Sequence, residues 1–104
     1  MIILEEIVTS AKHAETNKNV KFPLGFIRVS EQEGLREWEG SMQDIEDYGP
    51  LLDLFNSNKP SEFEFVCKKG KVFKGKIAVT GILVSDVLFK GVGALKYGEE
   101  YIVD

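Results

Sequence analysis

The chain has 104 residues, of which 43% are hydrophobic and 29% are charged, and its formal net charge is −4. This length predicts a single domain, residues 1–104, whose core needs no metal or disulfide. No apolar run approaches the roughly 20 residues of a membrane helix, and the beginning MIILEEIV is too short and too acidic for a signal peptide. The single cysteine, Cys67, fits a reducing compartment, so we expect a cytoplasmic protein with no membrane partner.

The first predicted element is a helix within residues 1–19. Its apolar residues recur at helical spacing on one face, namely at Leu4, Ile7, Val8, Ala11 and Ala14. Glu5 and Glu6 suit the amino end of a helix dipole, and the polar residues 17–19 would end the helix. A strand over residues 2–8 is the competing interpretation, because β-branched residues are frequent there.

Residues 20–39 predict two strands joined by a turn at 31–34. The first strand is rich in β-branched and aromatic residues, and Pro23 and Gly25 indicate an edge or a bend in its first half. The second strand carries Trp38. An exposed Trp is favoured at protein interfaces, but the interpretation that we prefer is that Trp38 covers the core.

A broken central helix is predicted next. Ser41 and Asp44 have the spacing of a capping box, although Asp stands where Glu is usual. Gly49-Pro50 interrupts the helix, and a second, apolar helical segment would follow at 51–55. The residues expected to face the core in the first segment are Met42, Ile45 and Tyr48.

Everything after Pro60 is predicted to be β structure, with a hairpin, a strand at 82–90 and a short apolar strand at the end of the chain. The predicted fold class is therefore α+β. We expect an antiparallel meander, as a partly closed barrel or a small sandwich, with an N-terminal helix and a broken central helix.

The hairpin that opens this β region allows two registers. A two-residue turn would put Phe65 opposite Lys74 and mix apolar with charged side chains on one face. A three-residue loop, residues 69–71, instead pairs Glu64 with Lys76, and we predict this register. Its apolar face, expected to be buried, consists of Phe63, Phe65, Cys67, Phe73 and Ile77.

Lysines crowd the same hairpin, at Lys68, Lys69, Lys71, Lys74 and Lys76. Residues 1–64 hold 13 acidic and 6 basic residues, a net charge of −7, whereas residues 65–104 hold 4 acidic and 7 basic residues, a net charge of +3. Lysines at strand edges keep sheets from pairing with other chains, and this is the role that we favour. The alternative is attraction to an acidic surface.

Catalytic chemistry finds little support. His13 is the single histidine, and Cys67 lies on the apolar face of a predicted strand, where a reactive thiolate is not expected. No serine lies in a G-x-S-x-G motif, and no Cys or His pair has zinc spacing. Gly91 and Gly93 are not followed by the helix that a phosphate loop requires. We therefore expect no enzyme, no cofactor and no metal site.

The leading functional prediction is a non-catalytic protein-interaction module, such as an inhibitor or immunity-type protein that covers a basic partner site with its acidic half. The alternative is a structural subunit that self-associates through sheet edges, as phage tail and decoration proteins do. The third is nucleic-acid binding through the Lys68–Lys76 hairpin, which the acidic total and the two arginines disfavour. The expected partner is thus another protein or a second copy. The candidate binding residues are Trp38, Asp44, Asp47, Lys68, Lys69, Lys71 and Lys74.

Overall fold

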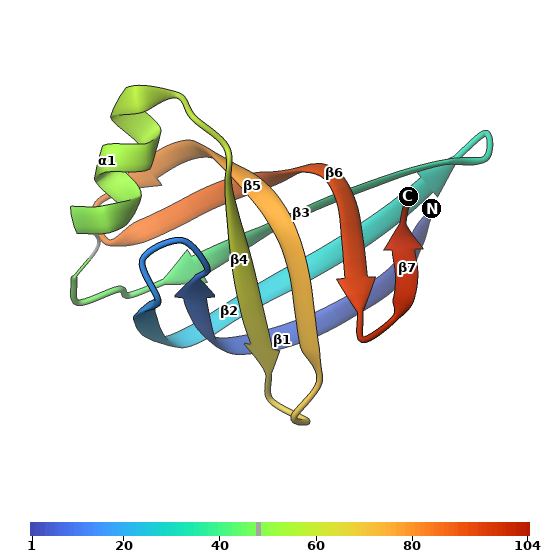
Figure 1. The fold of residues 1–104 in the computed structure, drawn as a ribbon, viewed down its shortest axis with the longest axis horizontal. Helices are drawn as coiled ribbons and strands as arrows, with labels where there is room; N and C mark the ends of the chain where they lie inside the picture. The colour runs from blue at the N-terminus through green and yellow to red at the C-terminus, as the bar shows by residue number, and fades with distance from the viewer. Residues whose placement is uncertain (48) are drawn as a thin grey trace.

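The structure, a computed structural model, describes residues 1–47 and 49–104, and these residues are almost entirely β (Figure 1). The one helix among them is α1 (Gly49–Ser57). The strands are β1 (Ile2–His13), β2 (Lys18–Gln32), β3 (Leu35–Gln43), β4 (Ser61–Cys67), β5 (Val72–Leu83), β6 (Asp86–Tyr97) and β7 (Glu100–Val103).

Six of the strands form a closed antiparallel barrel. Two three-stranded meanders, β1–β2–β3 and β4–β5–β6, meet along two seams, where β1 pairs with β4 and β3 pairs with β6. The chain passes from the first meander to the second through α1, and β7 folds back on the end of β6 (Figure 1). Closure pairs most strand edges within the molecule, so few backbone groups are left unpaired.

The barrel interior is the hydrophobic core, and aromatic rings fill much of it. Phe65 stacks between Phe63 and Phe89, with ring centroids 6.0 and 5.2 Å away. Leu51 of α1 and Val103 of β7 are buried against this core from opposite ends of the molecule (Figure 1). The two end elements therefore keep water from the barrel interior.

The predicted N-terminal helix is wrong, because these residues form β1. The ladders on both sides of β1 shift register between Val8 and Ser10. This bulge adds a residue, so the buried positions change from every second residue to a step of three, from Val8 to Ala11. A bulged strand thus produces the spacing of a helix face.

The first half of the predicted central helix is also wrong, and with it the α+β fold class. Ser41 lies inside β3, where it pairs with Phe26 on one side and Leu88 on the other. Pairing with two strands outweighs a local capping signal. The second half is confirmed, since α1 begins at Gly49, while Tyr48 lies outside the described residues.

The β4–β5 hairpin has the predicted faces but a register shifted by two residues. All five residues of the expected apolar face are buried. Phe65 pairs with Phe73 and Glu64 with Lys74, so the predicted pairing of Glu64 with Lys76 is wrong. The loop consists of residues 68–70 and ends on a glycine with a φ of +88°, which is the usual place for glycine in a three-residue hairpin loop.

The predicted single strand at 82–90 is in fact two strands, because the chain turns at Val84 and Ser85. The turn at 31–34 is confirmed, with Glu33 and Gly34 as its central residues. Both have positive φ, as a two-residue hairpin turn requires.

Candidate functional site

An arm projects from the barrel beyond the seam between β3 and β6. β2 and β3 pair as far as Gln32 with Leu35, but β3 reaches β6 only between Glu39 and Met42. The tip of the β2–β3 hairpin therefore extends past the barrel, together with the first residues of β1 (Figure 1). We call residues 1–6 and 28–37 the arm.

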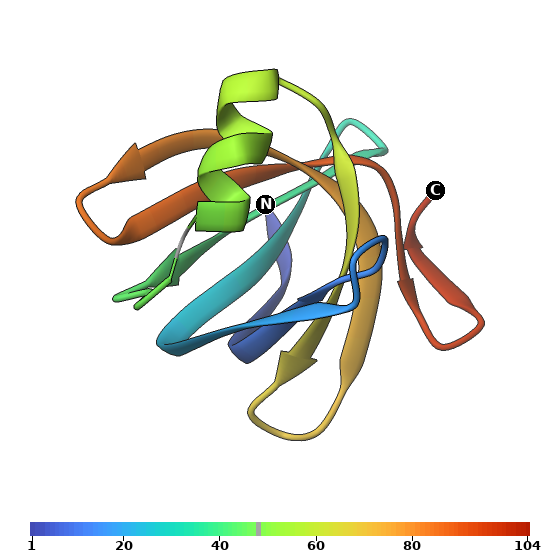
Figure 2. The same cartoon turned by 60° about the vertical axis from the view of Figure 1, so that its left-hand side comes forward.

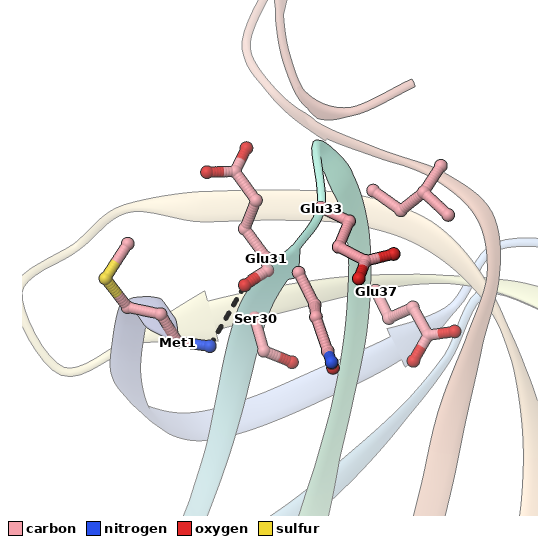
Figure 3. Close-up of a pocket in the computed structure, with 7 residues that line it drawn as sticks. Met1, Ser30, Glu31, Glu33 and Glu37 are labelled. Carbon is pink, nitrogen blue, oxygen red and sulfur yellow. Dashed lines mark hydrogen bonds between the residues drawn. The ribbon is translucent and has the colours of Figure 1, made fainter.

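Glutamates gather on the arm around a pocket of about 230 Å³ (Figure 3). The Met1 amino group donates a hydrogen bond to the Glu31 carbonyl oxygen at 3.0 Å, and the Glu31 carboxylate accepts one from Arg36 Nε at 3.0 Å. Glu33 and Glu37 also line the pocket, and neither has an ion-pair partner among the described residues. The arm thus carries uncompensated negative charge.

Apolar side chains are exposed beside these carboxylates. Met1 is 82% exposed and Leu35 is 75% exposed, and both line the same pocket. Exposed apolar groups with a polar rim are found at protein-binding surfaces.

The lysine-rich hairpin projects away from α1 (Figures 1 and 2), and two of its lysines are engaged within the molecule. Lys71 Nζ lies 3.2 Å from Glu6 Oε1, and Lys74 Nζ lies 3.2 Å from Glu64 Oε1. Lys68 and Lys69 are exposed at the tip, and no ion pair involves them among residues 1–47 and 49–104. In the described part of the chain, the hairpin lysines without an ion pair are therefore Lys68 and Lys69 at the tip and the exposed Lys76 of β5.

The other predicted binding residues lie apart from the lysines, and Trp38 lies apart from Asp44 and Asp47. Trp38 is 2% exposed and belongs to the core, so its ring is not available on the surface. Asp44 and Asp47 follow the far end of β3, at the opposite end of that strand from the arm. They line open pockets with Lys21 and Glu46.

The two residues considered for covalent chemistry are also apart. Cys67 pairs with Val8 and His13 pairs with Phe63, which separates them by four residues of strand, about 13 Å. Burial, with a smaller contribution from Glu6, raises the pKa of the Cys67 thiol to about 11. In the described part of the chain, no three His, Cys, Asp or Glu side chains are placed to hold a metal ion.

Sequence reasoning missed the arm residues Glu33, Glu37, Met1 and Leu35. It located the turn, but it could not show that the hairpin projects, because this depends on where β3 leaves β6. Among the described residues, no helix has the length and apolarity needed to cross a membrane. Comparison of the chain with known protein families, curated proteins and solved structures gave no match.

Proposed function

We propose that this chain is a non-catalytic protein-interaction module that binds a basic surface of another protein through its arm. The observation that supports the proposal best is the projection of uncompensated carboxylates, Glu33 and Glu37, next to exposed Met1 and Leu35. Burial of the apolar side chains would supply affinity, while the carboxylates would steer a basic partner into place. A single buried thiol, Cys67, supports a reducing compartment such as the cytoplasm.

Nucleic-acid binding by the Lys68–Lys76 hairpin is less well supported. Lys71 and Lys74 already pair with glutamates of β1 and β4, and the net charge of the chain is −4. A polyanion would have to displace these glutamates, and it would be repelled by the rest of the molecule. We therefore prefer a protein partner.

The proposal is tested by affinity capture from a lysate of the source cells, with the partner then purified and titrated. The double variant Glu33→Lys with Glu37→Lys should lose this partner, because the arm would repel a basic surface. The control, Glu46→Lys with Asp47→Lys, makes the same change of charge at the other end of the barrel and should retain it. Added salt should weaken the complex, since the steering charges are exposed. Equal binding by both double variants would contradict an arm-based site.

A further inference from the structure

One edge of β1 is open for half of the strand. β1 pairs with β2 from Ile2 to His13, but it pairs with β4 only from Val8 onwards. The last main-chain contact on that side is the hydrogen bond that Lys68 N–H donates to the Ile7 carbonyl oxygen, at 2.9 Å. Among the described residues, no strand continues along residues 2–6.

The open edge presents unpaired main-chain groups. The Ile7 carbonyl points towards the β4 side, and N–H and C=O groups alternate in direction along a strand. The N–H and C=O of Glu5 therefore point the same way, into the space beyond the end of β4. Such groups form a template for a further strand.

The side chains of this segment favour association rather than prevent it. Ile2 is 54% exposed, and Met1 and Ile3 are also exposed. Natural edges are usually protected by lysine, proline, an uncompensated charge or a β-bulge, and the β1–β2 ladder has one such irregularity between Ile2 and Leu4. Here the segment has no Lys or Pro, and its carboxylates are neutralised, Glu5 by Arg28 at 3.1 Å and Glu6 by Lys71 at 3.2 Å.

We propose that this edge pairs with the same edge of a second copy of the chain, antiparallel and about a two-fold axis. A second copy fits because an antiparallel pair of identical strands satisfies the same main-chain groups on both sides, and because isologous contacts close as dimers. In such a ladder of residues 2–6, Leu4 lies opposite Leu4 of the other copy, and Ile2 and Ile3 lie opposite its Glu6 and Glu5. Compensation of Glu5 and Glu6 removes the like-charge repulsion that would otherwise oppose this contact.

The lysine tip limits the length of this contact. The incoming strand would continue the line of β4, and β4 ends at Cys67, where Lys68 bonds to Ile7. Lys68 and Lys69 therefore stand at the end of the open segment and restrict the new ladder to residues 2–6. So short a contact buries little surface, and the dimer should be weak and dependent on concentration.

The test is the mass of the purified chain in solution, measured by sedimentation over a wide range of concentrations. The average mass of the wild type should rise from that of one chain to that of two chains as the concentration rises. Glu5→Pro removes the N–H from the open edge without breaking a bond to β2, and it should raise the dissociation constant about tenfold or more. Glu5→Gln is the matched control, because it loses the same carboxylate but keeps the N–H, and it should still dimerise.

Ile3→Lys provides a second variant, which should also be monomeric. It replaces Glu5→Pro if circular dichroism shows that Glu5→Pro does not fold. A wild-type chain that stays monomeric at every concentration would overturn the proposal. So would a dimer that persists in Ile3→Lys, or assemblies larger than two. A dimer that dissociates as salt rises would overturn it as well, because that result would assign the contact to the lysine tip and an acidic surface.

Discussion

The buried Trp38 shows how single residues determine the packing of this barrel. The indole lies where two glycines leave room for it, and a Cβ on Gly75 would be 2.6 Å from Trp38 Cζ2. Its Nε1 donates a hydrogen bond to the Gly93 carbonyl oxygen at 3.0 Å, which satisfies the one polar group of a ring that is otherwise surrounded by apolar atoms. The structure confirms the preferred sequence interpretation that Trp38 belongs to the core, although Glu37 and Glu39 flank it.

Gly91→Ala should destabilise the fold strongly. A Cβ at this position would overlap the indole of Trp38, and neither the ring nor the strand can move far in a closed barrel. We expect a loss of about 3 kcal/mol or more, measured by urea unfolding. Gly81→Ala is the control, because its Cβ would meet only Leu88 Cδ1 at 3.8 Å, and it should change stability little.

Cys67 should make stability depend on alkaline pH. Burial raises the thiol pKa from its ordinary 9.0 to about 11, so the folded state holds this proton more tightly than the unfolded state does. The contribution of the protonated Cys67 thiol to the free energy of unfolding is present below pH 9 and is lost as the pH rises through 11. Comparison of urea unfolding at pH 8 and pH 11 should show a loss of about 2 kcal/mol in wild type that is absent in Cys67→Ala.

Among the elements, β1 explains most of the error in the predicted fold. The spacing of Leu4, Val8 and Ala11 satisfies a helix, yet it arises from a strand with a bulge after Val8. The bulge lies where β1 begins to pair with β4 as well as with β2, and these partners are far away in the chain. By contrast, the buried and exposed faces of the β4–β5 hairpin could be predicted, because buried and more exposed positions alternate along its paired residues without a break.

The contacts between elements at the candidate site left no pattern in the sequence. The hairpin lysines were identified, but the ion pair of Lys71 with Glu6 joins residues from different meanders and leaves no local signal. The open edge of β1 was equally hidden, because it exists only where β4 happens to end. Sequence patterns describe one element at a time, whereas both features are relations between elements.

We predict that a substitution in the turn between β5 and β6 can stabilise the fold. Val84 has a φ of +60° in a two-residue turn and is 90% exposed, although glycine is the residue favoured where the first position of such a turn has positive φ. Val84→Gly should relieve a cost of about 1 kcal/mol and raise the melting temperature by several degrees. Val84→Ala, which keeps a Cβ, should give a smaller gain, and a lower melting temperature for the glycine variant would contradict this account.

At the scale of the whole molecule, charged side chains lie on the two hairpins that extend from the barrel. Glu33 and Glu37 lie on the projecting arm, and Lys68 and Lys69 lie at a separate hairpin tip; none of the four has an ion-pair partner among the described residues. The two seams close the barrel, and the arm and the tip are paired extensions of its strands. Substitutions on either should therefore change binding without changing the core.

The seams also determine the order in which the strands can pair during folding. Pairs such as Val8 with Cys67 and Met42 with Val87 join segments far apart in the chain, whereas each meander contains only neighbouring strands. We expect the meanders to form first and closure to come late, in milliseconds to seconds. Until then, four strand edges are exposed to other chains, so refolding yield should fall steeply as protein concentration rises, as measured by recovered monomer and dimer after dilution from urea. A yield that is independent of concentration would show that closure outpaces encounters between chains.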